Sequence, residues 1–261
     1  RLININKPIA YIPSLAIHLN KEANTNNSIN AQTDIVPIIA TEQKEFNEFI
    51  LEELQCSSEA KVLSHELNLY DLTKASLLGI KNDFITSSRL DNLLSCFAGL
   101  TALIESDKAF VCSFMDHEEV GSDSHVGAGG SFLKDVLERV IRVESPRFYQ
   151  KSVMISCDNA HAQHPNFPYK HENEHTPHLN QGIVIKINSN QRYATNAFTQ
   201  SLIIEAAEKA NIPIQYFVTR SDLGCGSTIG PITASKLGIK TIDVGIPQLG
   251  MHSIREICGS K

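Results

Sequence analysis

From Asp83 onward, apolar runs rich in β-branched residues alternate with segments whose apolar residues recur at helical spacing. Few folds accommodate that order. We expect strands at 110–115, 153–157, 182–187, 215–219 and 241–245, and helices at 88–104, 132–143 and 197–210. Strands that alternate with helices predict an α/β sandwich built around a mostly parallel sheet.

The first part of the chain has a different pattern, with short apolar runs around an Asn-rich polar stretch. We expect strands at 1–8, 16–19 and 36–40, a loop at 20–34, and helices at 41–55 and 58–69. The change of pattern near residue 80 predicts two domains, an accessory one over residues 1–82 and a catalytic one over residues 83–261.

Composition narrows the class of protein. The net charge of −6 argues against a nucleic-acid partner, because phosphates are bound by basic surfaces. The sequence has no apolar run long enough to cross a bilayer, so no membrane contact is expected. The six cysteines include no CxxC pair, which favours reduced thiols and a cytoplasmic protein over a zinc finger. Because the chain begins without Met, we also expect it to be part of a longer protein.

Carboxylates and a histidine follow the predicted strands, at the points where those strands end. They are Asp116, Glu118, Glu119, Asp158 and His252. Ligands of open α/β sheets bind beyond the carboxyl ends of the strands, so we expect these side chains to meet at one rim. Crowded carboxylates repel one another unless a cation lies between them. Mixed oxygen and imidazole ligands suit zinc, manganese or cobalt.

Two further features indicate hydrolysis with two metals. Asp91, on the first turn of its predicted helix, is placed to bridge two ions about 3.5–4 Å apart. Glu118 and Glu119 are adjacent, and consecutive residues of an extended chain point in opposite directions. One can therefore bind a metal while the other takes a proton from water. A bare Glu-Glu pair is usually two solvated loop acids, but this pair follows an apolar strand.

Several blocks, in order along nearly the whole chain, resemble signature blocks of the aspartyl aminopeptidase family. The blocks are 13–19, 88–93, 116–122, 158–166, 185–193, 225–231 and 251–256. The resemblance implies a three-layer α/β/α zinc-peptidase domain with an inserted β-rich dimerisation domain. Residues 1–82 would be part of that insert. Residues 83–261 would be the catalytic domain, without its first metal-binding histidine and its C-terminal helix. Dimers would assemble into a tetrahedral dodecamer.

The resemblance also implies an activity, the hydrolysis of N-terminal Asp or Glu from peptides by two divalent ions, zinc above all. Asp91 would bridge the ions, and Glu119, Asp158 and His252 would complete most of their coordination. Glu118 would be the general base and, like Asp158, would also contact the substrate. The substrate pocket would further include His161, Lys186 and Tyr193, and His18 of a neighbouring subunit would bind substrate and support the transition state.

Three of these residues have simpler interpretations as well. Lys186 is the one lysine within an apolar strand, and a substrate carboxylate would pair its buried ammonium. A solvent-facing strand edge would explain that lysine equally well. His161 could be a solvated loop residue, and His18 could be a satisfied core residue.

Residues 171–175 read His-Glu-Asn-Glu-His and satisfy the H-E-x-x-H pattern of zinc proteases. That chemistry requires a helix, yet Pro168 and Pro177 flank the segment and it has no apolar face, so we expect a polar loop. Three alternatives to an acid-specific aminopeptidase remain: a zincin endopeptidase, a non-catalytic scaffold on a peptidase fold, and an aminopeptidase of broader specificity.

Overall fold

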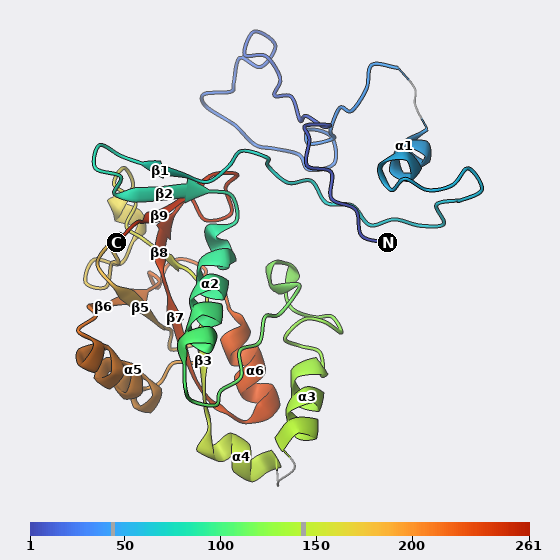
Figure 1. Ribbon diagram of the computed structural model, residues 1–261. Coiled ribbons are helices and arrows are strands. Elements are labelled where there is room, and N and C mark those ends of the chain that lie inside the picture. Colours follow the sequence, from blue (N-terminus) through green and yellow to red (C-terminus); the bar gives the residue numbers. More distant parts are fainter. Residues whose placement is uncertain (43–44, 142–144) are drawn as a thin grey trace. The chain divides into compact units, whose positions relative to one another are not determined.

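The computed structural model describes residues 1–42, 45–141 and 145–261. The chain divides into two compact units, Arg1–Thr73 and Lys74–Lys261 (Figure 1). The larger unit begins before residue 83 because β1 (Ser76–Leu78) pairs with β2 (Phe84–Ser87). That residues 1–82 belong to a dimerisation domain stays a prediction.

The first unit has little regular structure. It contains the helix α1 (Phe46–Glu53) and one antiparallel bridge, in which Tyr11 and Ile38 exchange N–H···O bonds of 3.0 and 2.8 Å. The strands predicted at 1–8, 16–19 and 36–40 are otherwise wrong, as is the helix predicted at 58–69. The helix predicted at 41–55 is shorter than expected, and residues 43–44 lie outside the described residues. Short apolar runs form strands only where a partner completes the ladder.

The second unit contains two mixed sheets. The four-stranded sheet has the order β3 (Val153–Cys157), β7 (Lys240–Gly245), β5 (Ile183–Ile187), β6 (Ile214–Val218). Its β3–β7 and β5–β6 pairs are parallel and its β5–β7 pair is antiparallel. The five-stranded sheet has the order β1, β2, β9 (Glu256–Gly259), β8 (Pro247–Leu249), β4 (Ala160–His161). The predicted α/β class is confirmed, but the sheets are mixed rather than mostly parallel.

Helices cover the four-stranded sheet. Figure 1 shows α5 (Ala197–Ala210) on one side of it and α2 (Leu90–Glu105) and α6 (Ile229–Leu237) on the other. The core beneath α5 is formed by Ile185, Ile242 and Val244, packed against Ile203 and Ile204. The remaining helical elements are α3 (Phe132–Ile141), α4 (Ser145–Lys151) and the 3₁₀ turns η1 (Glu118–Val120) and η2 (Pro168–Lys170).

Local sequence explains why α5 begins at Ala197. The side chain of Asn196 accepts hydrogen bonds from the backbone N–H groups of Phe198 and Thr199, and the Thr199 hydroxyl accepts one from Asn196 N–H. This reciprocal capping box satisfies donors that a helix start otherwise leaves free. At the other end Asn211 adopts a left-handed conformation, with φ 55°, and ends the helix.

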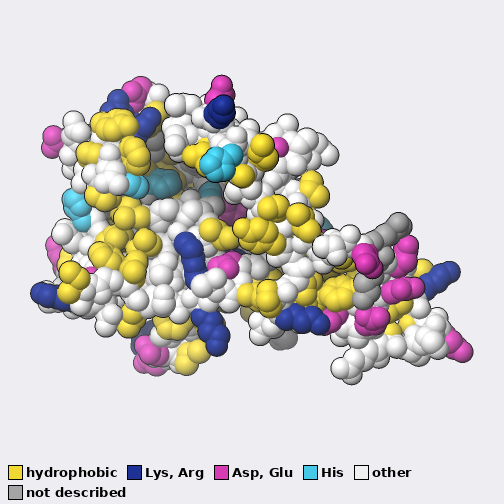
Figure 2. Space-filling model, turned by 90° about the horizontal axis from the view of Figure 1, so that it is seen from above, with side chains coloured by type: hydrophobic (Ala, Val, Ile, Leu, Met, Phe, Trp, Pro, Cys, Tyr) yellow, Lys and Arg dark blue, Asp and Glu magenta, His cyan; other side chains and the backbone are white. Residues whose placement is uncertain are grey.

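Two predictions about apolar segments need correction. The strand predicted at 110–115 does not form, because the segment has no ladder partner among the described residues. Phe110 and Phe114 are accordingly exposed. The helix predicted at 88–104 is confirmed as α2, but much of its apolar stripe is exposed, including Phe97 and Ile104. Apolar side chains are also visible on the face shown in Figure 2. The helix predicted at 132–143 is confirmed as α3, and residues 142–143 lie outside the described residues.

Strand β5 sets the orientation of one predicted site residue. It lies between β7 and β6, and Ile183, Ile185 and Ile187 pack on the α5 side of the sheet. Because side chains alternate along a strand, Val184 and Lys186 point to the opposite face. The Lys186 side chain is only 3% exposed. The interpretation of Lys186 as a solvent-facing edge residue is therefore wrong.

Candidate metal centre and active site

Three side chains with metal-ligating atoms meet in the second unit. They are Asp91 near the start of α2, Glu119 in η1 and His252 in the turn after β8, and one ligand atom of each lies within 4.8 Å of the others. The His252 Nε2 atom lies 3.2 Å from Asp91 Oδ2 and 3.2 Å from Glu119 Oε2. The structure thus brings together three of the four predicted metal ligands, from segments far apart in the sequence.

Asp91 is the most buried member of this group, with a side chain only 4% exposed. Its Oδ1 atom is buried and has no hydrogen-bond partner among the described residues. A buried acceptor without a partner is costly, and a cation would satisfy it. The backbone of Asp91 is extended, with φ −81° and ψ 111°, so Asp91 precedes the regular helix and does not lie on its first turn. Two carboxylates and an imidazole are a donor set that suits zinc.

Asp158, the fourth predicted ligand, directly follows β3 and lies beside Asp91. The carboxylate of Asp158 is close enough to act electrostatically on that of Asp91. Burial, together with the negative charges of Asp158 and Glu119, raises the pKa of Asp91 to about 7. Both the burial and the crowded negative charges disfavour the ionised carboxylate, and a bound cation would offset both. The electrostatics of the group therefore fit a bound cation.

Glu118 lies at the edge of this group. Burial raises the pKa of Glu118, and the charges of Asp158 and Glu119 raise it further, whereas Lys186 and His252 lower it. Glu118 and Glu119 lie in a 3₁₀ turn and not on the extended chain that we expected. Successive residues of a 3₁₀ turn are rotated by about a third of a turn, so the two carboxylates still point in different directions.

Lys186 has a partner within the protein. Its Nζ atom donates a hydrogen bond of 2.7 Å to Asp158 Oδ2 and lies 5.3 Å from the centre of the Tyr193 ring. The prediction that a substrate carboxylate pairs this ammonium is therefore incomplete, because Asp158 already neutralises it. Tyr193 is buried against Phe217, with ring centres 6.3 Å apart, and its burial raises the pKa of its hydroxyl.

His161 ends β4 and is not in a loop. Its ring makes an edge contact with Phe217, with ring centres 5.7 Å apart. Desolvation of the ring, together with the positive charge of Lys186, lowers the pKa of His161. The imidazole is therefore neutral at neutral pH and lies near the Lys186–Tyr193 contact.

The other two histidine predictions have different outcomes. His18 belongs to the first unit and is exposed, so its role stays a prediction. The 171–175 segment forms no α-helix, which confirms the expected loop. His171 Nε2 accepts a hydrogen bond from the backbone N–H of His164, and His175 Nδ1 pairs with Glu172 at 2.8 Å. Local contacts thus occupy the motif's side chains.

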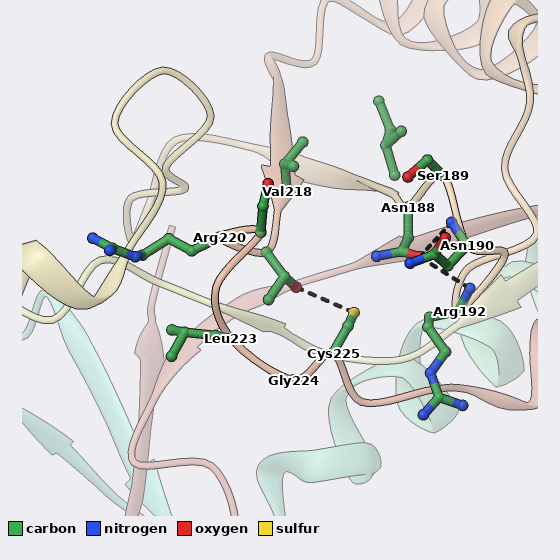
Figure 3. A pocket seen from close by; sticks show the side chains of 12 residues that line it. Asn188, Ser189, Asn190, Arg192, Val218, Arg220, Leu223, Gly224 and Cys225 are labelled. Atoms are coloured by element: carbon green, nitrogen blue, oxygen red, sulfur yellow. Dashed lines mark hydrogen bonds between the residues drawn. The ribbon is translucent and has the colours of Figure 1, made fainter.

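A cavity of about 510 Å³ opens at the carboxyl ends of β5 and β6 (Figure 3). Cys225 lines it and accepts a hydrogen bond of 3.2 Å from the Thr219 hydroxyl, and it also packs against the core cluster that contains Tyr193. The cavity therefore adjoins the predicted substrate-binding residues without containing any metal-site residue.

Sequence reasoning missed Asp243, a fully buried carboxylate in β7. Its two oxygens accept hydrogen bonds of 2.6 Å from the Ala194 N–H and from the Thr228 hydroxyl. The first contact fixes the segment that follows Tyr193, and the second fixes the start of α6. The signal in the sequence was an aspartate in the middle of an apolar strand.

We expect Asp243→Asn to lower the free energy of unfolding by about 1–3 kcal/mol, because the amide keeps one acceptor oxygen for two donors in a buried site. Urea unfolding monitored by circular dichroism measures this loss. Asp107→Asn, at an aspartate whose side chain is 87% exposed, is the matched control and should change nothing. Equal stability of the two variants would contradict this role.

Comparison with known proteins gives a consistent result. The family model described as aminopeptidase I zinc metalloprotease (M18) matches residues 1–261. A probable M18 family aminopeptidase 2 of Ectopseudomonas mendocina is 50% identical over 271 residues, covering 100% of this chain and 63% of its own length. The chain thus spans less than two thirds of the curated relatives that it matches.

Solved structures are also similar to this chain. A chain of the Ape4 and Nbr1 complex, determined by cryo-electron microscopy, is 40% identical with a TM-score of 0.89, and the match covers 99% of this chain and 56% of that one. The S. cerevisiae mApe1 dodecamer is 28% identical with a TM-score of 0.78, and the match covers 97% of this chain and 59% of that one.

Proposed function

The chain belongs to the aminopeptidase I zinc metalloprotease (M18) family, and from this premise we propose that the protein is a metal-dependent aminopeptidase that removes acidic residues from peptide N-termini. The observation that carries the proposal is the convergence of Asp91, Glu119 and His252, with the Asp91 Oδ1 atom buried and unpaired. The Oδ2 atom of Asp91 contacts His252, and its Oδ1 atom has no partner among the described residues. A carboxylate with its two oxygens available in this way suits a bridge between two ions.

Each residue then has a defined task. Asp91 would bridge two zinc ions, and Glu119, Asp158 and His252 would hold them from the sides. Bound zinc lowers the pKa of a water molecule and polarises a carbonyl group. Glu118 would take the proton of the attacking water and return it to the leaving amine, and its raised pKa suits both steps.

The preference for acidic residues rests on Lys186. An ammonium group has three N–H donors, and the hydrogen bond to Asp158 uses one of them. The others can bind a substrate carboxylate, with neutral His161 and Tyr193 beside them. The hydrogen bond between Lys186 and Asp158 also supports the alternative of broader specificity, because Asp158 already neutralises the charge of Lys186.

Assembly and cellular location are part of the proposal. Likeness to the mApe1 dodecamer supports a homo-oligomer, in which His18 of one subunit would contribute to the site of a neighbour. A cytoplasmic location stays a proposal drawn from the unpaired cysteines. Among the described residues, no helix combines the length and the hydropathy of a membrane span.

Turnover of aminoacyl amides by the intact protein tests this function. We expect aspartyl and glutamyl amides to be cleaved faster than leucyl and alanyl amides, and a chelator to stop all four reactions. Faster cleavage of the leucyl amide would reject the acidic preference while leaving the aminopeptidase assignment standing.

Lys186→Met should selectively reduce kcat/KM for the aspartyl amide. A hydrogen bond to a charged group is worth about 1.5–3 kcal/mol, which corresponds to about a 10- to 150-fold loss. The ratio of aspartyl to leucyl turnover is the readout, since general damage to the site lowers both rates. Lys209→Met, at an exposed lysine of α5, is the control and should leave that ratio unchanged.

A further inference from the structure

Glu256, on strand β9, is a buried carboxylate that contacts two of the proposed metal ligands through their backbones. The residue is only 2% exposed. The Oε2 atom accepts a hydrogen bond of 2.9 Å from the backbone N–H of Asp91, and the Oε1 atom accepts one of 2.7 Å from the backbone N–H of His252. One side chain therefore links two segments that are far apart in the sequence.

We propose that Glu256 is a positioning residue that holds Asp91 and His252 in the arrangement in which they share a metal ion. It lies outside the group of converging ligand atoms that Asp91, Glu119 and His252 form, and each of its oxygens accepts from a backbone donor. The inference rests on the metal site put forward under the proposed function and adds a residue on which the affinity of that site depends.

The backbones that Glu256 holds do not adopt regular conformations. Asp91 has an extended backbone just before the regular part of α2. His252 has φ 64°, in the left-handed region that most residues avoid. Neither conformation is fixed by a regular helix or ladder, so the two hydrogen bonds that Glu256 accepts help to maintain them.

A carboxylate is well suited to this task. Its two oxygens accept on both sides, and hydrogen bonds to an ionised acceptor are shorter and stronger than those between neutral groups. The negative charge also lies at the start of α2, where the helix dipole favours it. An amide in the same place would keep one acceptor and turn its NH₂ group toward a backbone N–H.

The sheet around Glu256 keeps the carboxylate in place. Glu256 pairs with Ser87 of β2, and the next residue, Ile257, pairs with Leu249 of β8. Strand β8 leads into the turn that carries His252. The carboxylate thus projects from a strand that is bonded on both sides, which limits how far either metal ligand can shift.

A second buried polar side chain holds the other side of the same peptide. The Asn159 Nδ2 atom donates hydrogen bonds of 2.8 Å to the Leu90 carbonyl and of 2.8 Å to Gln248 Oε1. Asn159 follows Asp158, so this contact ties the segment that bears the fourth proposed ligand to the residue before Asp91. The backbone around Asp91 is held on both sides, with Glu256 on the N–H side.

Metal affinity in Glu256→Gln and Glu256→Asp variants of the intact protein tests the proposal. Zinc titration against a chelating indicator should give a dissociation constant about 10–100-fold weaker than wild type in each variant, as is typical when an outer-shell partner of a ligand is lost. Shortening the side chain by one methylene should act like the amide, because one carboxylate oxygen then fails to reach its donor. Activity lost at limiting zinc should return at high zinc concentration.

Two controls separate positioning from general stability. Glu205→Gln changes an exposed glutamate of α5 and should leave zinc affinity unaltered. Leu137→Ala removes packing between α3, α4 and α6, away from all the proposed ligands, and should lower stability without changing zinc affinity. A Glu256 variant that unfolds without zinc but refolds at high zinc supports the proposal, and one that saturating zinc fails to rescue overturns it.

The outcomes also distinguish this inference from the function on which it depends. If the wild-type protein binds no zinc, the metal site itself is wrong and the role of Glu256 falls with it. If the wild-type protein binds zinc and both Glu256 variants bind it equally well, only the positioning role is overturned.

Discussion

Glu118→Gln should lower kcat by about 10²- to 10⁴-fold and leave the metal content of the protein unchanged. The amide has nearly the same shape as the carboxylate but cannot accept a proton from water. Burial and the neighbouring acids raise the pKa of Glu118 above its usual range, which suits a group that must both accept and release a proton. Steady-state kinetics on an aspartyl amide, together with metal analysis of the same sample, measures both quantities.

The matched control is Glu208→Gln, at an exposed glutamate on α5, which should retain wild-type kcat. Near-normal turnover in the Glu118 variant would remove Glu118 from the role of base. A variant that is inactive because it has lost its metal would instead reassign Glu118 to the ligand set.

Asp91→Asn should weaken metal binding more than Glu118→Gln does, because the proposed bridging carboxylate would contact both ions. An amide carries no charge and offers one acceptor oxygen, so we expect metal content to fall and activity to be lost with it. Metal analysis after dialysis against buffered zinc gives the stoichiometry. Full metal content in this variant would show that Asp91 is not the bridge.

The same substitution should have the opposite effect on stability once metal has been removed. The folded pKa of Asp91 is raised to about 7 from 3.8, so the folded state binds the proton more tightly than the unfolded state does. The stability of the metal-free wild-type protein should therefore fall as pH rises between about 4 and 7. Asp91→Asn removes that penalty, so in chelator the variant should be more stable than wild type at pH 8. Urea unfolding across this pH range would refute the expectation if wild type remained the more stable protein throughout.

Sequence patterns predicted elements that local features define. The helix expected at 197–210 matches α5, because an Asn cap and a left-handed Asn terminate it locally. The strands at 153–157, 182–187 and 241–245 match β3, β5 and β7 to within a residue. The strand expected at 110–115 failed, because a strand also requires a partner, and periodicity within one segment contains no information about a partner elsewhere.

The site residues likewise divide into those that local sequence could predict and those that depend on long-range contacts. The position of Asp158 at the end of β3 was predictable from the strand pattern. Glu119 follows a segment that forms no strand and Asp91 lies near the start of α2, so their approach to His252 depends on long-range packing. The partner of Lys186 and the contacts of Glu256 were not predictable from local pattern. Both depend on which atoms face each other across the fold, and a buried charge in a strand signals only that some partner exists.

The central claim is that Asp91 lies between two metal ions, and a crystal structure of the zinc-loaded intact protein, with anomalous data collected at the zinc edge, tests it most directly. We predict two anomalous peaks about 3.5–4 Å apart, each in contact with a different oxygen of Asp91. Glu119, Asp158 and His252 should complete the two coordination shells. A single peak, or two peaks that Asp91 does not join, would contradict the two-metal account.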